Sequence, residues 1–386
     1  MRNMPIKSGW IVRKFEDFVE NVREQAMPTK EDSEKYIGLE HLDSRSLHVR
    51  RWGTKIQLKG TKFRMKKGDL LFARRNAYLR RVAIAPHDGL FSAHGIIFRP
   101  KADIVLSDFL PFFLLSDVFM DRAIKISVGS LSPTINWGTL RYEEFSLPPL
   151  DEQKRLADLL WSMDVAIESY YNLLNKLIIA RDSLLKENYQ DIHKELYAIS
   201  YIAEINPRID RKNIKKDMLV SFVTMADISE EGHIINKEDR KYSEVEKGFT
   251  PFKDGDILFA KITPCMENGK GAIVSELTNG LGFGSTELHV IRPKDKDDTY
   301  YLYYLTQMFH LRKKAEQLMT GSAGQKRVPS NFFDFYKFNL PEKRKRKDLG
   351  SQLRKYDYKI DHLKKNIIIT NNIQKQIINQ IFGGKL

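Results

Sequence analysis

Gly-Asp-Leu-Leu-Phe-Ala at residues 68–73 returns almost unchanged as Gly-Asp-Ile-Leu-Phe-Ala at residues 255–260. Further matches follow in the same order at a separation close to 193 residues. They are Phe98-Arg99-Pro100 with Ile291-Arg292-Pro293, Val128-Gly129-Ser130 with Thr320-Gly321-Ser322, and Phe145-Ser146-Leu147-Pro148 with Phe338-Asn339-Leu340-Pro341. A repeat of this length predicts two copies of one domain, and a chain of 386 residues is long enough to hold them.

A long helical pattern follows the Leu-Pro of each copy. Apolar residues recur there with alternating spacings of four and three, which is the seam of a coiled coil. The seam residues of the first copy are Leu156, Leu160, Met163, Ile167, Tyr170 and Leu174. Those of the second copy, each 193 residues later, are Leu349, Leu353, Tyr356, Ile360, Leu363 and Ile367. Six matches at one offset make coincidence improbable.

Both helices have recognisable ends. Pro148-Pro149 precede the first, and Asp151-Glu152 place negative charge at the positive end of its dipole, so we expect a helix over about 151–191. The second is expected over about 342–382, before Gly383-Gly384. Forty residues give a rod of roughly 60 Å. Two such rods most simply pack on each other, although each could instead pack on its own globular domain or on a partner.

Short strand-like runs separated by turn residues fill the segment before each helix, together with one helix-like stretch near 107–124 and near 299–319. The predicted fold class is α+β, with an internal pseudo-two-fold repeat in which two similar mixed α/β domains alternate with two long helices. The expected bounds are 1–150 for the first domain, 151–195 for the central helix, 196–340 for the second domain and 341–386 for the C-terminal helix.

The balance of charge favours a polyanionic partner. The chain has 64 Lys and Arg against 50 Asp and Glu, a net charge of +14, which points to nucleic acid or an anionic membrane. No uncharged apolar run of roughly 18 residues exists, and the N-terminus does not resemble a secretory signal. Cys265, the single cysteine, excludes an internal disulfide framework and cysteine-based zinc sites. We therefore expect a cytoplasmic protein with no membrane partner.

No catalytic motif stands out. Asn206-Pro207-Arg208 lacks the second proline and the aromatic residue of a methyltransferase loop, and Pro264 stands where a phosphate loop ending at Gly269-Lys270 needs a glycine. No spaced Cys/His cluster indicates a metal. We expect a chain without catalytic residues, bound cofactor or metal. The alternatives are a methyltransferase or nuclease with a divergent site, and a scaffold that does not touch nucleic acid.

Directly after the strand-like run at 70–72, a loop carries side chains suited to DNA. These candidates are Arg74, Arg75, Asn76, Tyr78, Arg80 and Arg81. Arginine and asparagine make two-pronged hydrogen bonds to guanine and adenine edges, and a loop beside a rigid strand suits recognition. The second copy places Lys261, Thr263 and Lys270 in the corresponding loop. Nearly identical strands with different loops are what two readers of two sequences would need. A solvated surface hairpin is the alternative.

A second candidate region is the run of small residues at 320–327. Its candidates are Ser322, Gln325, Lys326 and Arg327, and Ser130 is the candidate of the first-copy counterpart at 129–136. Small residues permit close approach of the backbone to phosphate or base. An ordinary flexible loop is the alternative. The basic run 343–347 opposes the helix dipole, and either contacts phosphates or forms a solvated helix face.

This arrangement resembles the specificity subunit of type I restriction–modification systems, the HsdS family. The resemblance rests on Leu-Pro-Pro-Leu-Asp-Glu-Gln-Lys-Arg-Leu-Ala at 147–157, Met163-Asp164 in the helix, the repeated Gly-Asp-Leu/Ile-Leu-Phe, and Gly-Ser before the final strand of each domain. It covers essentially the whole chain. The second copy departs from the pattern at 341–345, Pro-Glu-Lys-Arg-Lys, so its helix start need not meet a partner as the first does.

The resemblance implies two target-recognition domains, each reading one half of a bipartite double-stranded DNA sequence. It implies that the long helices form an antiparallel coiled coil that sets the gap between the halves. It further implies two modification (methyltransferase) subunits that use S-adenosylmethionine, and restriction (motor-nuclease) subunits that use ATP and magnesium.

Overall fold

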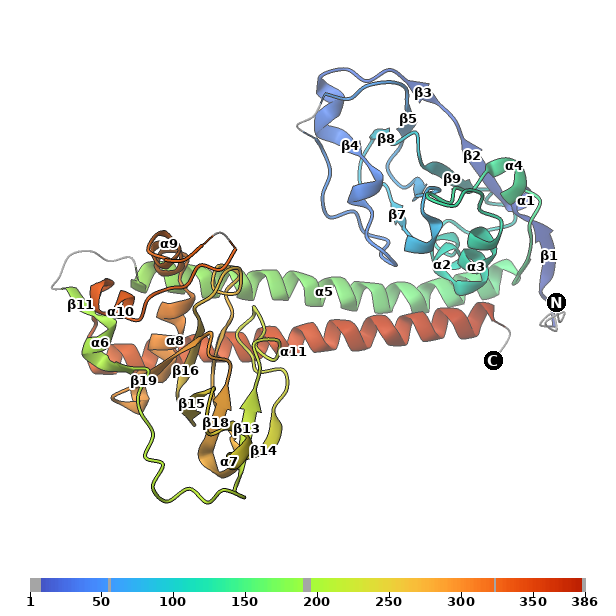
Figure 1. The fold of residues 1–386 in the computed structure, drawn as a ribbon. Coiled ribbons are helices and arrows are strands. Elements are labelled where there is room, and N and C mark those ends of the chain that lie inside the picture. The colour runs from blue at the N-terminus through green and yellow to red at the C-terminus, as the bar shows by residue number, and fades with distance from the viewer. Residues whose placement is uncertain (1–7, 55–56, 190–195, 323, 384–386) are drawn as a thin grey trace. The chain divides into compact units, whose positions relative to one another are not determined.

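The computed structural model describes residues 8–54, 57–189, 196–322 and 324–383. The chain forms two compact units (Figure 1). Unit 1 comprises residues 1–172 with 365–386, and unit 2 comprises residues 173–364. The predicted helix end at 191, Gly384, and Ala323 of the candidate run 320–327 lie outside the described residues. The domain bounds predicted from the sequence stay a prediction.

Two small sheets form the globular part of unit 1. The first has the order β2-β9-β6-β7 with every pair antiparallel, and the second has the order β3-β5-β8-β4 with β4 parallel to β8. A separate antiparallel pair, β1 with β10, joins the start of the globular part to its end. The strands are β1 Ile11–Lys14, β2 Val19–Val22, β3 Gln25–Ala26, β4 Tyr36–Ile37, β5 Lys62–Met65, β6 Leu70–Phe72, β7 Val82–Ile84, β8 Gly89–Phe91, β9 Ile96–Pro100 and β10 Glu144–Leu147. The short helices are α1 Phe15–Phe18, α2 Leu110–Leu115, α3 Asp117–Lys125 and α4 Trp137–Leu140.

Unit 2 repeats this plan. Its first sheet has the order β12-β19-β16-β17, its second β14-β13-β18-β15 with β13 parallel to β18, and β11 pairs with β20. The second sheets differ in one edge strand, because β3 lies beside β5 in unit 1 whereas β14 lies beside β13 in unit 2. The strands are β11 Leu196–Ala198, β12 Ala203–Ile205, β13 Leu219–Val223, β14 Glu238–Lys241, β15 Thr250–Lys253, β16 Ile257–Ala260, β17 Gly271–Ile273, β18 Leu281–Gly284, β19 Leu288–Pro293 and β20 Lys337–Asn339. The short helices are α6 Ile199–Ile202, α7 Tyr242–Val245, α8 Thr299–Gln307, α9 Phe309–Gln317 and α10 Phe332–Phe335.

The repeated motifs form the same ion pair in each unit, between a buried aspartate and a half-buried arginine. Asp69 accepts from Nε and Nη2 of Arg99 at 2.6 and 2.9 Å. Asp256 accepts from the same two atoms of Arg292, both at 2.7 Å. Two-pronged charge-assisted bonds are strong and directional, so each pair fixes β6 to β9, or β16 to β19. The recurring Gly-Asp and Arg-Pro motifs are therefore two ends of one interaction.

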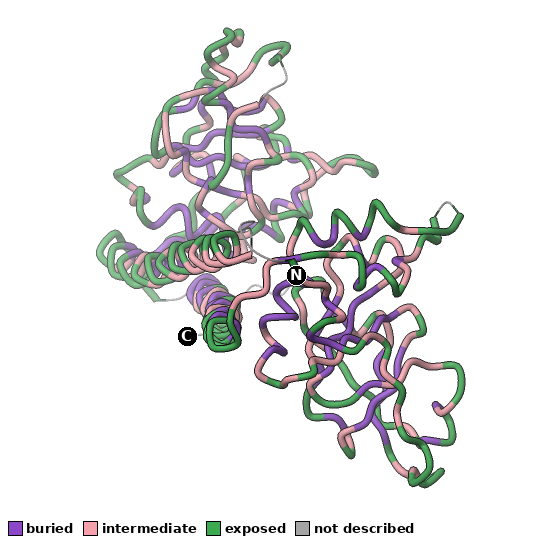
Figure 2. Tube along the Cα trace, turned by 90° about the vertical axis from the view of Figure 1, so that its left-hand side faces the viewer, coloured by how far each residue is buried: buried purple, intermediate pink, exposed green. Residues whose placement is uncertain are grey.

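Each unit has one main core that includes the long helices. In unit 1 the core contains Phe98 of the first sheet, Phe119 of α3 and Leu160 of a long helix. In unit 2 it contains Phe259 of the first sheet and Leu353 of a long helix. Figure 2 shows the buried segments gathered inside each globular part.

The two long helices are α5 Leu150–Tyr189 and α11 Lys343–Phe382. Their directions follow from one contact in each unit. Gln374 of α11 donates from Nε2 to the carbonyl of Leu160 of α5 at 3.4 Å in unit 1, and Arg181 of α5 pairs with Asp357 of α11 at 3.0 Å in unit 2. Residue numbers rise along α5 as they fall along α11. The antiparallel packing and the predicted fold class are therefore confirmed.

None of the twelve predicted seam residues is exposed. The buried ones are Leu160, Ile167, Leu349, Leu353, Ile360, Leu363 and Ile367, and the half-buried ones are Leu156, Met163, Tyr170, Leu174 and Tyr356. Those near the helix starts contact the globular cores, where Leu156 joins the core of unit 1 and Leu349 that of unit 2. The seam residues thus pack against the globular parts as well as against the opposite helix.

Different side chains anchor the two helix starts at matched positions. Gln153, buried in α5, donates from Nε2 to the carbonyl of Pro148 at 2.9 Å. Arg346, which lies 193 residues later in α11, donates from Nη1 to the carbonyl of Pro341 at 2.7 Å. Arg346 also forms a two-pronged pair with buried Asp298, at 2.7 and 2.8 Å. The departure of the second copy from the family pattern therefore preserves the anchor in another chemical form.

The basic run at the start of α11 meets an acidic turn of its own unit. Lys343 pairs with Asp295, and Lys347 pairs with Asp297 at 3.1 Å. Together with the Arg346–Asp298 pair, these contacts offset the unfavourable interaction of positive charge with the helix dipole. Arg344 in addition lies 4.0 Å from Asp348 of the same helix, so four of the five basic side chains at 343–347 are paired within unit 2.

Candidate nucleic-acid interface

The loop that follows β6 carries some side chains that are exposed and others that bond within unit 1. Arg75 is exposed, and Tyr78 is 55% exposed. Arg80 is turned inward, where its guanidinium pairs with Asp117 and Asp121 of α3. Arg75 and Tyr78 lie at the surface of unit 1, whereas Arg80 attaches the loop to a helix.

The other polar side chains of this loop also bond within unit 1. Arg81 donates from Nη1 to the carbonyl of Leu39 at 2.8 Å, and burial lowers the pKa of Arg81. Arg74 donates from Nη2 to the carbonyl of Ala93 at 3.4 Å. Asn76 has a left-handed backbone with φ of 55°, which asparagine tolerates better than most residues. These residues set the shape of the loop.

A hairpin over 128–134 joins this loop through the backbone. The amide of Ile135 donates to the carbonyl of Arg74 at 3.0 Å, and the amide of Asn76 donates to the carbonyl of Pro133 at 2.8 Å. Ser130, at the tip of the hairpin, is exposed. The two regions that the sequence suggested separately therefore form one surface, the loop pair of unit 1 (residues 74–81 and 128–134).

Unit 2 connects its loop to its hairpin with the same backbone bonds. We call this connection the joint of each unit. The amide of Val328 donates to the carbonyl of Lys261 at 2.8 Å, and the amide of Thr263 donates to the carbonyl of Lys326 at 3.0 Å. These four residues occupy the positions of Ile135, Arg74, Asn76 and Pro133 in unit 1. We call residues 261–270 and 320–327 the loop pair of unit 2.

The exposed side chains of the second loop pair differ from those of the first. Ser322, Gln325 and Lys326 are exposed on the hairpin. Arg327 forms a two-pronged pair with Glu287, at 2.8 and 2.8 Å, and this bond lowers the pKa of Glu287. Its partner is therefore within unit 2, although 41% of the Arg327 side chain remains exposed.

The three candidates on 261–270 are half-buried. Thr263 donates from its hydroxyl to Glu267 Oε1 at 2.5 Å, and Lys270 donates from Nζ to the carbonyl of Met225 at 3.0 Å. Lys261 contributes the backbone bond to the hairpin. Internal hydrogen bonds therefore hold the conformation of residues 261–270. Most of the exposed polar candidates of the loop pair of unit 2 lie on the hairpin.

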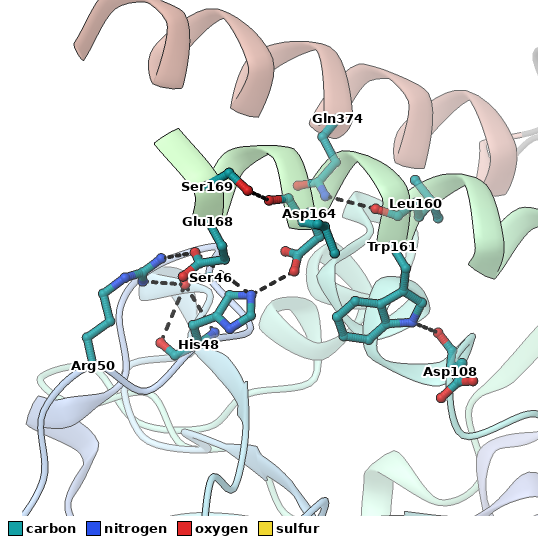
Figure 3. A network of polar contacts seen from close by, with 11 residues as sticks. Ser46, His48, Arg50, Asp108, Leu160, Trp161, Asp164, Glu168, Ser169 and Gln374 are labelled. Carbon is teal, nitrogen blue, oxygen red and sulfur yellow. Dashed lines mark hydrogen bonds and ion pairs between the residues drawn. The ribbon is translucent and has the colours of Figure 1, made fainter. Parts of the chain in front are cut away.

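A polar network joins the globular part of unit 1 to α5 (Figure 3). His48 lies 2.7 Å from Asp164, measured from Nε2 to Oδ2, and Arg50 pairs with Glu168. Trp161 donates from Nε1 to the carbonyl of Asp108 at 2.9 Å. The globular part that carries the loop pair of unit 1 is therefore attached to α5 by polar and charged contacts as well as by its apolar core.

Unit 2 attaches to its helix at matched positions. His233 lies 3.2 Å from Asp361 of α11, and Tyr304 donates its hydroxyl to Asp357 at 2.5 Å. Asp357 and Asp361 follow Asp164 and Glu168 by 193 residues. In the sequence, Met163-Asp164 is only one motif of the family resemblance, whereas in the fold the carboxylates at these positions bind the globular parts.

His48 makes the stability of unit 1 depend on pH. The hydrogen bond with Asp164 raises the pKa of His48 above its ordinary value of 6.5, aided by the charges of Asp164 and Glu168 and opposed by burial and by Arg50. The stabilisation is therefore complete below that ordinary pKa and is lost as the pH rises through the raised one.

We expect the thermal unfolding midpoint of unit 1 to decrease as the pH is raised from about 6 to about 9. His48→Gln should flatten this dependence, because glutamine can still donate to Asp164 but does not titrate. Thermal unfolding followed by tryptophan fluorescence measures the change, since all four tryptophans belong to unit 1. An equally steep fall in the variant would show that other groups cause it.

None of the described helices combines the length and apolar character that crossing a bilayer requires. Within the described ranges, no three His, Cys, Asp or Glu side chains are grouped so that they could hold a metal ion.

Comparison with known proteins gives matches over both copies. A family model described as the type I restriction modification DNA specificity domain matches residues 7–177 and again residues 193–378. The Escherichia coli type I restriction enzyme EcoEI specificity subunit is 37% identical over 193 residues, and the EcoAI specificity subunit is 37% identical over 191 residues. Each match covers 49% of this chain and 32% of the relative, so the matched part spans about a third of these relatives.

A solved structure shares the fold. The S subunit of a type I restriction–modification system from M. genitalium is 13% identical, over 99% of this chain and 98% of that one, with a TM-score of 0.63. Because the family model matches both copies over nearly their whole length, this chain belongs to the type I restriction–modification specificity (HsdS) subunit family.

Proposed function

We propose that this chain reads a bipartite double-stranded DNA sequence within a type I restriction–modification complex, with one half-site bound by each unit. The observation that carries the proposal is the matched pair of joints, whose backbone bonds are the same in both units while the exposed side chains differ. Base pairs are distinguished by their patterns of donors and acceptors, so two half-sites need one frame with two sets of side chains.

The exposed residues of the loop pairs are the proposed DNA contacts. In unit 1 these are Arg75, Tyr78 and Ser130, and in unit 2 they are Ser322, Gln325 and Lys326. The other candidates bond within their own units and are proposed to shape the loops. They are Arg74, Asn76, Arg80, Arg81, Lys261, Thr263, Lys270 and Arg327.

The charge of the chain supports contact with phosphates. A net charge of +14 attracts a polyanion without selecting a sequence, and it makes affinity fall as salt rises. Sequence choice then depends on the loop pairs. A subunit that binds DNA would lie in the compartment that holds the DNA, which we expect to be the cytoplasm.

The long helices are proposed to set the gap between the half-sites. Within each unit the two helices pack antiparallel, and the predicted seam residues are buried or half-buried, which supports a role as a spacer. Two modification subunits would dock on this repeated scaffold and supply S-adenosylmethionine-dependent methylation. Restriction subunits would supply ATP- and magnesium-dependent translocation and cleavage. The chain itself would contribute recognition and no catalytic group.

Methylome sequencing of cells with and without this chain tests the proposal. We expect a split methylation motif that is present with the chain and absent without it. Replacing residues 1–150 by the corresponding part of another family member should change one half of the motif and leave the other half intact.

Two results would contradict the proposal. A methylome that does not change on deletion would favour a scaffold without DNA contact. Methylation or cleavage of duplex DNA by the purified chain alone, given S-adenosylmethionine or magnesium, would favour an enzyme.

A further inference from the structure

Arg312 of α9 is a buried cation that lacks an acidic partner in the described part of the chain. It is 7% exposed, and burial lowers its pKa to about 10. Its Nε has no hydrogen-bond partner there. Burying a charge without a counter-charge is unfavourable, so packing alone does not account for an arginine at this position.

The first copy shows that a hydrocarbon side chain fills the same place. Phe119 lies 193 residues before Arg312, is fully buried, and contacts Phe72 with ring centroids 5.7 Å apart. Arg312 lies over Phe259, the counterpart of Phe72, at 4.8 Å from the ring centroid. The same contact is thus made by a phenyl group in unit 1 and by a guanidinium in unit 2.

The guanidinium provides hydrogen bonds that a phenyl group cannot. Arg312 donates from Nη1 to the carbonyl of Met266 at 2.5 Å and from Nη2 to Gln307 Oε1 at 3.1 Å. Met266 is fully buried and lies in the middle of the 261–270 half of the loop pair of unit 2. A β-carbon on Gly271 would lie 3.4 Å from Nη2, so the guanidinium fits closely against the end of the loop.

We infer that Arg312 is a positioning residue for sequence discrimination by unit 2: by bonding the carbonyl of Met266, it holds the loop at 261–270 in the conformation in which the joined hairpin meets DNA. The inference rests on the proposed function. It also explains why the loop of unit 2 can differ from that of unit 1, where Arg80 pairs with Asp117 and Asp121 to hold the corresponding loop.

The test compares Arg312→Met with Arg312→Lys in the full complex. Methionine fills similar space without donors, whereas lysine keeps the charge but cannot reach both carbonyl groups in the way a two-pronged guanidinium does. Methylome sequencing measures, for each half of the motif, how often mismatched sites are methylated.

We expect Arg312→Met to raise methylation at sites mismatched in the half read by unit 2 by roughly fivefold to tenfold, without change in the other half. Arg312→Lys should give an intermediate rise. The control is Val245→Ala, which truncates a buried residue in a different core of unit 2 and should lower stability without relaxing either half.

If Arg312→Met discriminates between sites as well as the wild-type chain does, the inference is overturned. If the methionine variant does not accumulate in cells, wild-type discrimination in Arg312→Lys overturns it instead. Equal relaxation in Val245→Ala, or in both halves, would also overturn it, because it would indicate general loosening. Failure of the proposed function looks different: the wild-type chain would then yield no split motif to relax.

Discussion

Replacing Asp298 by alanine is expected to destabilise unit 2 by about 3–5 kcal/mol. Asp298 is 2% exposed and binds both nitrogens on one edge of the Arg346 guanidinium. Without it, the guanidinium of Arg346, which is nearly as buried, keeps its hydrogen bond to the carbonyl of Pro341 but loses its two-pronged carboxylate partner. Removing one partner of a buried pair costs more than the pair contributes, because the remaining charge stays desolvated.

Chemical denaturation followed by two signals measures this loss. Circular dichroism reports the helices of both units, whereas tryptophan fluorescence reports unit 1 alone. The Asp298→Ala chain should lose part of its circular dichroism at a lower denaturant concentration while its fluorescence transition moves less.

Asp295→Ala is the matched control from the same acidic turn. Asp295 pairs with Lys343, but the two side chains are 36% and 58% exposed, so water screens the pair and removing Asp295 should cost much less stability than removing Asp298. Similar losses in the two variants, or no loss in Asp298→Ala, would mean that the buried pair does not anchor the start of α11.

The sequence predicted the repeat and both long helices because those signals are local. A seam residue such as Leu160 recurs with a period set by the helix itself, and its counterpart Leu353 follows at a constant offset. The start of α11 was harder to interpret, because the carboxylates that offset its basic run are about 50 residues earlier in the chain.

A signal for that pairing was nevertheless present in the two copies. Asp295, Asp297 and Asp298 stand where the first copy has Ala102, Ile104 and Val105, and the helix starts differ in charge at the same time. Opposite changes of charge in two segments of one repeat indicate that the segments are in contact. Comparing the copies for charge as well as for apolar residues would have predicted the anchor.

The roles of the individual loop residues did not follow from the sequence. Arg75 and Arg80 are equivalent in a local pattern, and only the fold shows that Arg80 meets carboxylates 37 and 41 residues away. The joining of each loop to a hairpin also depends on backbone bonds between segments far apart in the chain, as between Arg74 and Ile135. Long-range pairing of this kind has no periodic signal.

Arg75→Ala should weaken binding of the complex to its own sequence by about 1–3 kcal/mol, a loss of roughly fivefold to 150-fold, and relax one position of the half-site read by unit 1. Arg75 is exposed, and backbone bonds to the hairpin hold the loop that carries it. Binding of matched and singly mismatched duplexes to the full complex, at fixed salt, measures both effects, and mismatches in the other half-site serve as an internal reference.

Arg80→Ala separates reading from folding within the same loop. Because the guanidinium of Arg80 is held by Asp117 and Asp121, its removal should lower the stability of unit 1 by about 1–2 kcal/mol, seen in tryptophan fluorescence, while discrimination between duplexes is kept. If Arg75→Ala instead kept its discrimination and Arg80→Ala lost it, the inward arginine would be the reading residue, and the loop would have to rearrange on DNA for that side chain to reach a base.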